Sequence, residues 1–139
     1  MNSASSSTAA RLPLILCIDD DEISLRVRKL LLVSVGLTVL TANSAEGGFE
    51  LFKQNPIELV IADHFLTDKT GTEIAREMKE LKPEVPILIL SAAAETIDGL
   101  EFADGFLSKG EPPEVVLDTI AHLLVKSPEI LPVHMEQPP

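Results

Sequence analysis

Four short apolar runs in this sequence each end in residues that can bind phosphate or a divalent cation. Those residues are Asp19, Asp20, Asp21, Asp63, Ser91 and Lys109. Carboxylates supply the oxygen ligands that Mg²⁺ prefers, and the ion keeps several of its waters when it binds them. A lysine ammonium is a compact charge that can lie beside a phosphoryl oxygen. The residue types are therefore those of a magnesium-dependent site that accepts a phosphoryl group.

The apolar runs also predict how these distant residues meet. They alternate with helical patterns, which indicates parallel strands in an α/β sheet that is buried on both faces. In such a sheet the carboxyl ends of the strands share one edge, and ligands bind there at the topological switch point. We therefore expect the polar residues to converge in a single crevice.

Strand and helix patterns alternate five times along the chain. The expected strands cover residues 13–18, 37–42, 57–62, 86–90 and 103–107, the last of them at an edge of the sheet. The expected helices cover residues 21–34, 45–54, 71–81 and 94–101, with a last one that opens at Pro112-Pro113. In the first helix, a stripe at helical spacing is expected to face the core, and it is formed by Ile23, Val27, Leu30 and Leu31.

Composition limits the class of protein. At 139 residues the chain is long enough for one domain with a single core. The net charge of -11 and the pI of about 4.6 argue against a nucleic-acid backbone as a direct partner. No apolar run reaches the roughly 18 residues of a membrane span, and the N-terminus lacks the pattern of a signal peptide. We therefore expect a cytoplasmic protein that does not enter a membrane.

The two ends of the chain differ in composition from its middle. Residues 1–11 are small and polar and are expected to be disordered, and the proline-rich residues 127–139 are expected to form a flexible tail. The ordered domain is expected to cover residues 12–126. Its lone cysteine, Cys17, cannot form an internal disulfide and is expected to fill the core.

Four sequence motifs resemble, in their order and spacing, those of the receiver domain of bacterial two-component response regulators. They are Ile-Asp-Asp-Asp-Glu at 18–22, Asp63 followed by Gly71, Leu-Ser-Ala at 90–92 and Phe-Leu-Ser-Lys at 106–109. The resemblance covers residues 12–126. It implies a doubly wound, five-stranded parallel sheet of (βα)5 type, with the flavodoxin-like order 2-1-3-4-5 and helices on both faces.

The resemblance assigns the acidic residues to a magnesium-dependent phosphorylation. Asp63 would be the phosphoacceptor. Asp19 and Asp20 would hold Mg²⁺ together with Asp63, and the backbone carbonyl of Phe65 would supply a further ligand. In such a reaction catalysis consists mostly of positioning and of placing positive charge near the phosphoryl group.

The resemblance also assigns the residues that respond to the phosphoryl group. Ser91 and Lys109 would bind its oxygens, and Ser91 and Phe106 would form the conformational switch. Phe65 and Ala93 occupy the two positions that tune dephosphorylation in this family. Neither of these side chains can hydrogen-bond an attacking water, so slow self-dephosphorylation is expected.

A domain of this kind takes part in signal transduction. The resemblance implies that a histidine kinase or a phosphotransfer protein supplies the phosphoryl group and that a downstream protein target reads the phosphorylated state. Homodimer formation is a further option for such domains. The chain would act as a stand-alone response regulator or as a phosphorelay intermediate. It would catalyse only its own phosphorylation and dephosphorylation, and would not be a turnover enzyme.

Three departures from the family pattern keep other functions open. Thr67 and Gly110 stand where the family usually has proline, and the interval from Ser91 to Lys109 is shorter by about one helical turn. A cis bond before a residue other than proline costs about 2.5–4 kcal/mol, so the Lys109–Gly110 bond is expected to be trans. One alternative is a degenerate receiver that serves as a phosphorylation-independent interaction module.

A second alternative is a phosphatase similar to the haloacid dehalogenases. Asp19 would then be the nucleophile and Asp21 the general acid. This hypothesis leaves Asp63 without a role, and the chain lacks a further acidic pair after Lys109.

Overall fold

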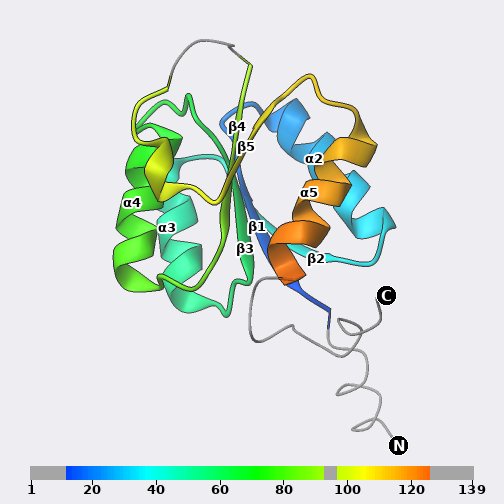
Figure 1. Cartoon of the computed structure of the whole chain (residues 1–139), viewed down its shortest axis with the longest axis horizontal. Coiled ribbons are helices and arrows are strands. Elements are labelled where there is room, and N and C mark those ends of the chain that lie inside the picture. The colour runs from blue at the N-terminus through cyan, green and yellow to red at the C-terminus, as the bar shows by residue number, and fades with distance from the viewer. Residues whose placement is uncertain (1–11, 93–96, 126–139) are drawn as a thin grey trace, which may run out of the picture.

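Five parallel strands form one sheet between two pairs of helices in the computed structural model, which describes residues 12–92 and 97–125 (Figure 1). The strands are β1 (Leu14–Ile18), β2 (Thr38–Ala42), β3 (Leu59–Asp63), β4 (Ile87–Ser91) and β5 (Gly105–Ser108). The helices are α2 (Glu22–Ser34), α3 (Ala45–Gln54), α4 (Gly71–Leu81) and α5 (Pro113–Val125), with a short 3-10 helix η1 (Leu100–Phe102).

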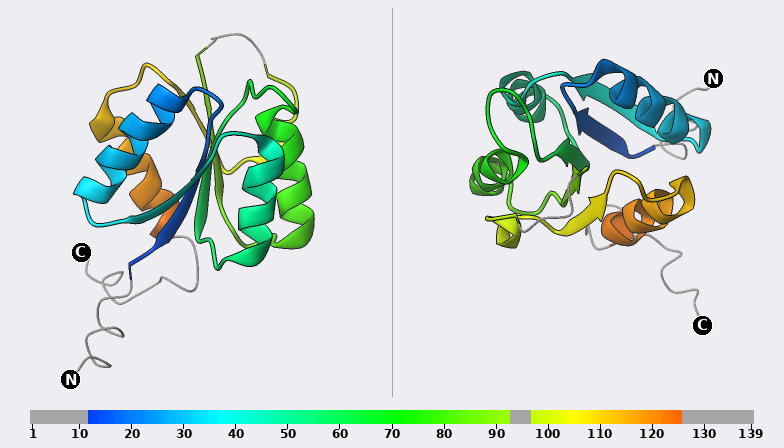
Figure 2. Two further views of the ribbon diagram at one scale, coloured as in Figure 1. Left: turned by 180° about the vertical axis from the view of Figure 1, so that it is seen from behind. Right: turned by 90° about the horizontal axis from the view of Figure 1, so that it is seen from above.

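The strand order is β2-β1-β3-β4-β5, and each neighbouring pair is parallel. Helices α3 and α4 cover one face of the sheet, and α2 and α5 cover the other, as both views of Figure 2 show. This is the doubly wound order expected from the sequence. The order reverses at β1 and β3, so the crevice for a ligand lies beyond the carboxyl ends of these two strands.

The sheet separates two apolar cores because successive strand residues point to opposite faces. In β1, Leu16 and Ile18 pack under α3 and α4, whereas Ile15 and Cys17 pack under α2 and α5. Cys17 is fully buried, as expected. Burial raises the pKa of its thiol to about 12, so the thiol stays protonated at neutral pH and acts as a small hydrophobe.

The helix ends follow from identifiable capping residues. Asp21 caps α2 by accepting a hydrogen bond from the amide of Ile23. Thr70 and Glu73 form a reciprocal capping box at the start of α4. Gly36, with φ of 96°, adopts the left-handed conformation that ends α2. These local signals explain why the observed bounds of α2 and α4 lie close to the expected ones.

The predicted core stripe of the first helix is wrong. Ile23, Val27 and Leu30 are 70%, 61% and 64% exposed, and the buried residues of α2 are Leu25 and Leu32. Leu31, the fourth residue of the predicted stripe, is partly buried, and the face of α2 that carries Leu25 and Leu32 packs against the sheet.

The expected helix over 94–101 is wrong in the part that the structure describes. Residues 97–99 form no helix, and only Leu100–Phe102 form a single 3-10 turn. Gly99 explains the difference, because its φ of 87° is a left-handed conformation that an α-helix cannot contain. Residues 93–96 lie outside the described residues, as do the two expected tails at 1–11 and 126–139.

No helix within 12–92 and 97–125 is both long and apolar enough to cross a membrane.

Candidate functional site

Three carboxylates meet at the carboxyl ends of β1 and β3. In these paired strands Ile18 lies opposite Ala62, so the residues that follow, Asp19 and Asp63, leave the sheet side by side. One carboxylate oxygen from each of Asp19, Asp20 and Asp63 lies within 4.8 Å of the others. Asp19 is fully buried, Asp63 is nearly so and Asp20 is exposed. The cluster is therefore anchored in the sheet and reaches solvent through Asp20.

Lys109 supplies a cation to this cluster. Its Nζ lies 2.9 Å from Oδ2 of Asp19 and 3.3 Å from Oδ2 of Asp63. The backbone amide of Lys109 donates to the carbonyl of Ser91, which places the lysine directly beyond β5. The peptide bonds of the described residues are all trans, so the bond to Gly110 is trans as expected. The lysine reaches the carboxylates with this bond in the trans form.

Arg28 is a second cation at the cluster, and the sequence interpretation missed it. Its Nη1 lies 3.3 Å from Oδ2 of Asp19, the same oxygen that Lys109 contacts. The side chain of Arg28 is only 12% exposed. The helical spacing of Leu25, Arg28 and Leu32 was the available signal, because it places the arginine on one stripe with two apolar residues.

Thr67 is a second residue that the sequence interpretation did not assign to the site. Its hydroxyl donates a 2.7 Å hydrogen bond to Oδ2 of Asp20. The backbone around it is held in place, because Phe65 and Thr70 form an antiparallel bridge. The exposed carboxylate of Asp20 is therefore oriented by a hydroxyl from the loop that follows β3.

Asp68 ties the same loop to helix α3. Its two carboxylate oxygens each accept a 3.0 Å hydrogen bond, from the amides of Ala45 and Glu46. Hydrogen bonding from the Ala45 amide lowers the pKa of Asp68, and the bond from Glu46 acts in the same direction. Lys69 then pairs with Glu77 of α4 at 2.6 Å. The loop is consequently fastened to both helices on this face of the sheet.

Burial and charge affect the titration of the site residues in different directions. Desolvation raises the pKa of Asp63, although the nearby Lys109 opposes this change. Burial by itself would lower the pKa of Lys109, but its hydrogen bond to Asp19 and the charges of Asp19 and Asp63 raise it. The lysine therefore stays charged, whereas burial makes the ionised form of Asp63 less stable.

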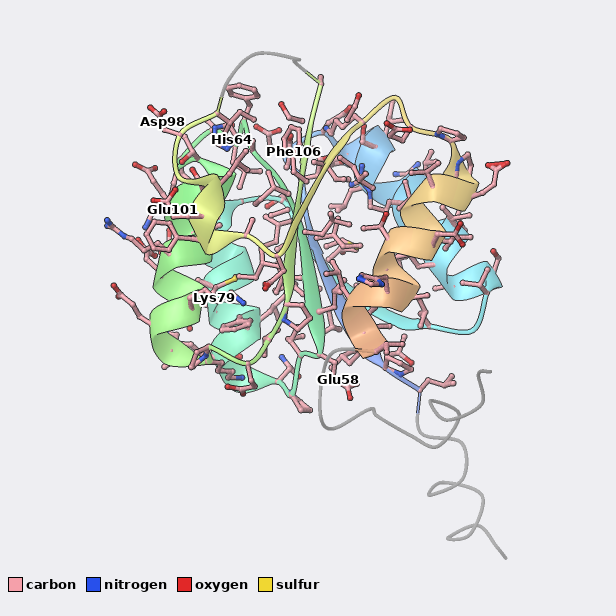
Figure 3. The ribbon with its side chains drawn as sticks, in the orientation of Figure 1. Glu58, His64, Lys79, Asp98, Glu101 and Phe106 are labelled. Carbon is pink, nitrogen blue, oxygen red and sulfur yellow. The ribbon has the colours of Figure 1, made fainter. Side chains whose placement is uncertain are left out.

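The remaining predicted site residues lie around the same edge of the sheet. Ser91 is fully buried and follows Leu90, which pairs with Asp63. Phe106 of β5 pairs with Ile89 of β4, and the residue is 39% exposed. Figure 3 shows Phe106 near the end of the sheet opposite Glu58.

The other two predicted positions differ in what the structure describes. The ring of Phe65 is exposed and packs edge-on against His64, with ring centroids 4.7 Å apart. Ala93 lies outside the described residues, so its expected effect on dephosphorylation stays a prediction.

Asp21 stands apart from this cluster. It is exposed and accepts hydrogen bonds from the amide of Ile23 and the hydroxyl of Ser24. The hydrogen bond from Ser24 lowers its pKa, as does the Ile23 amide. Asp21 is thus a deprotonated helix cap at neutral pH, which does not suit the general acid of a haloacid-dehalogenase-like phosphatase.

The donor set of the cluster fits a hard divalent cation. All the ligand atoms offered by Asp19, Asp20 and Asp63 are carboxylate oxygens, which suit Mg²⁺ better than zinc or copper. The cluster includes no histidine or cysteine. Asp20 is exposed, so water molecules can reach this side of the cluster.

A family model described as the response regulator receiver domain matches residues 15–121. The match includes all three carboxylates, Arg28, Thr67 and Lys109. Among curated proteins, the autoinducer 1 sensor kinase/phosphatase LuxN from Vibrio campbellii is 30% identical over 115 residues. That match covers 81% of this chain but only 13% of LuxN, so it concerns a small part of a longer protein.

Solved structures share the observed fold. A response regulator receiver domain protein from Clostridium thermocellum is 28% identical with a TM-score of 0.80, covering 86% of this chain and all of that one. The response regulator TrrA from Thermotoga maritima, solved in complex with Mg²⁺ and BeF, is 24% identical with a TM-score of 0.77. That match covers 81% of this chain and 99% of TrrA, and at this identity it supports the fold alone.

Proposed function

Because the chain belongs to the family of response regulator receiver domains, it is a phosphoacceptor signalling domain, and we propose that Asp63 is the residue that accepts the phosphoryl group. The observation that supports this assignment is the cluster of Asp63 with Asp19, Asp20 and Lys109 at the switch point of the sheet. Lys109 contacts both Asp19 and Asp63, but Asp19 is also held by Arg28 and by the amide of Asp21. Among the described residues, Asp63 has Lys109 as its charged partner, so its carboxylate is the less engaged of the two.

The proposed chemistry is a phosphoryl transfer from a phosphohistidine donor. An oxygen of Asp63 forms a bond to phosphorus while the phosphorus–nitrogen bond of the donor breaks. The electron pair of that bond stays on the imidazole nitrogen, which then takes a proton. Lys109, 3.3 Å from Asp63, lies where a phosphoryl oxygen can approach its charge.

We propose that Asp19, Asp20, Asp63 and the carbonyl of Phe65 hold Mg²⁺. When bound, the ion would offset the repulsion between the carboxylate and the incoming phosphoryl group. Asp19 is held in one position, because it is fully buried and its Oδ1 accepts a 2.9 Å hydrogen bond from the amide of Asp21. Asp20 is oriented by Thr67 and faces solvent.

The proposed switch is a shift between two populations. A phosphoryl group on Asp63 would be contacted by Lys109 and by the hydroxyl of Ser91, and these contacts exist in only one of the two states. The half-exposed Phe106 would turn toward the space that Ser91 leaves. With Phe65 and Ala93 at the tuning positions, slow self-dephosphorylation is part of the same proposal.

The proposed partners follow from the family. A histidine kinase or phosphotransfer protein in the cytoplasm would supply the phosphoryl group, and a downstream protein would bind the switched state, with a homodimer as a further assembly. The domain would catalyse only its own phosphorylation and dephosphorylation, as a response regulator or a phosphorelay intermediate. We propose that residues 12–126 suffice for this function.

The assignment of Asp63 is tested by incubating the full chain with Mg²⁺ and acetyl phosphate and measuring intact mass. The wild type should gain one phosphoryl mass, and Asp63→Asn should gain none. Asp21→Asn is the matched control, because it removes an exposed carboxylate outside the cluster. Label on Asp19 would instead support the phosphatase-like chemistry, and a wild type that gains no mass would indicate a phosphorylation-independent interaction module.

A further inference from the structure

Arg28 has a place in the molecule that packing alone does not explain. It lies three residues after Leu25 and four before Leu32, the two buried residues of α2. A leucine or valine at this position would continue the apolar stripe. The chain has instead a guanidinium that is almost buried and that contacts fully buried Asp19.

From this contact we propose that Arg28 is a built-in counter-ion of the carboxylate cluster, which weakens divalent-cation binding and thereby sets the Mg²⁺ concentration at which the domain can be phosphorylated. The inference rests on the proposed function, since it concerns the same cluster. It assigns Arg28 a positioning and electrostatic role, because the arginine acts through Asp19.

Asp19 already contacts two cations and one backbone amide. Oδ2 of Asp19 lies 3.3 Å from Nη1 of Arg28 and 2.9 Å from Nζ of Lys109. Its Oδ1 accepts the amide of Asp21 at 2.9 Å. Both oxygens of the buried carboxylate therefore already have donors, and a metal ion that binds Oδ2 must share it with two cations or displace one of them.

The two cations offset most of the negative charge of the cluster. Two fixed cations, Arg28 and Lys109, face the three carboxylates, so a single net negative charge remains to attract a divalent cation. The lysine has an alternative partner in Asp63, at 3.3 Å. Among the described residues, Arg28 has Asp19 as its charged partner and cannot lose its proton at any ordinary pH.

A metal ion bound to Asp19 would lie close to the guanidinium of Arg28. An ion bound to Oδ2 of Asp19 would lie within roughly 5 Å of the guanidinium, given metal–oxygen distances of about 2.1 Å. Repulsion between a double and a single charge at that separation amounts to about tenfold in the dissociation constant, even with the dielectric constant of water. Burial of Asp19 and Arg28 reduces screening by salt, so the effect should persist at physiological ionic strength.

The test compares Mg²⁺ binding to the wild type and to four variants of the full chain by isothermal titration calorimetry at fixed ionic strength. Arg28→Met should lower the dissociation constant about tenfold, and Arg28→Gln, which keeps a hydrogen-bond donor without the charge, should lower it by a similar factor. Arg28→Lys keeps the charge and should stay near the wild type. Arg26→Met is the matched control, because it removes an equal charge from an exposed position on the same helix.

Circular dichroism identifies which variants are folded, and the glutamine form keeps the test available if the methionine form does not fold. The Mg²⁺ concentration for half-maximal phosphorylation should fall in parallel with the dissociation constant. Unchanged or weaker binding in folded Arg28→Gln would overturn the role of Arg28 while leaving the metal site intact. If no form binds Mg²⁺ at millimolar concentrations, the proposed metal site itself fails, and this inference fails with it.

Discussion

Gly71 lies so close to Asp63 that a side chain has no room there. A Cβ on Gly71 would be 2.7 Å from the backbone carbonyl oxygen of Asp63 and 2.9 Å from Cα of His64. The amide of Gly71 donates a 2.7 Å hydrogen bond to the carbonyl of His64. The first residue of α4 therefore fixes the end of β3, where the proposed phosphoacceptor stands.

Gly71→Ala should disturb both stability and the site. The clashing atoms belong to the backbone and cannot rotate away, so the free energy of unfolding should fall by about 2 kcal/mol, within the range for overpacking. Acetyl phosphate labelling should slow because the strand end is displaced. Urea denaturation and labelling rates measure the two effects. Gly110→Ala is the control, since its Cβ would meet Ser108 Oγ at an ordinary 3.7 Å, and it should change stability by less than about 0.5 kcal/mol.

Thr67→Val should weaken Mg²⁺ binding while leaving the fold unchanged. Valine keeps the shape of threonine but cannot donate to Asp20, so this exposed carboxylate becomes mobile and must be ordered when a metal binds. Ordering one side chain corresponds to about a threefold increase in the dissociation constant. Titration calorimetry measures it, and Thr67→Ser should restore wild-type affinity. Equal affinity in the valine and serine variants would mean that the 2.7 Å hydrogen bond does not position Asp20.

Asp68→Ala should destabilise the protein in a pH-dependent way. Loss of the hydrogen bonds to the amides of Ala45 and Glu46 should cost about 1 kcal/mol, as for other helix caps. The pKa of Asp68 is lowered in the folded state, so its contribution is complete above its ordinary pKa and is lost as pH falls through the folded value. Urea denaturation should show a clear difference from the wild type at neutral pH and a smaller one below the ordinary pKa. A pH-independent difference would exclude this ionic contribution.

Asp63→Asn should stabilise the metal-free domain at neutral pH. Burial raises the pKa of Asp63 in the folded state, so its ionised form opposes folding. The wild type loses stability relative to the variant as pH rises above the ordinary pKa of an aspartate, and the difference is complete above the folded value. Thermal denaturation in a chelator across this pH range measures the difference. A lower melting temperature for the variant at neutral pH would show that the ion pair with Lys109 outweighs desolvation.

The sequence predicted the fold because local and long-range signals agree in most elements. Strands β1, β3 and β4 are continuous apolar runs, as expected for strands buried on both faces, and all three lie inside the sheet. The bounds of α4 were predicted correctly because Thr70 caps its start and Pro83 follows its end. The convergence of the three carboxylates follows from this topology, since parallel strands share one carboxyl edge.

The orientation of α2 could not be predicted from its apolar pattern. The stripe of Ile23, Val27 and Leu30 has the regular spacing of a core face, yet these three side chains are exposed. The buried stripe, with Leu25 and Leu32, is interrupted by Arg28, and a charged residue at a core position lowers the apolar score of that face. Because Arg28 lies on the buried face and pairs with Asp19, the apolar pattern predicted neither the orientation of the helix nor the second cation of the site.

The short segment before β5 was mispredicted for a different reason. Apolar residues at Ile97, Leu100 and Phe102 are compatible with a helix, but spacing does not reveal the left-handed backbone of Gly99. A side chain there would also meet Thr72 at 3.0 Å, so tertiary contact favours glycine at this position. Thr67 escaped prediction because a hydroxyl in a loop has no periodic pattern, and its partner Asp20 is 47 residues away.

The attachment of the loop after β3 determines how a chemical event at its base spreads. Asp68 joins this loop to the first turn of α3, and Lys69 joins it to the side of α4. The two helices lie side by side on one face of the sheet (Figure 1). We therefore expect a displacement of the loop to act on both helices together, so that covalent modification at its base would be read at the surface as a concerted movement of this helical layer.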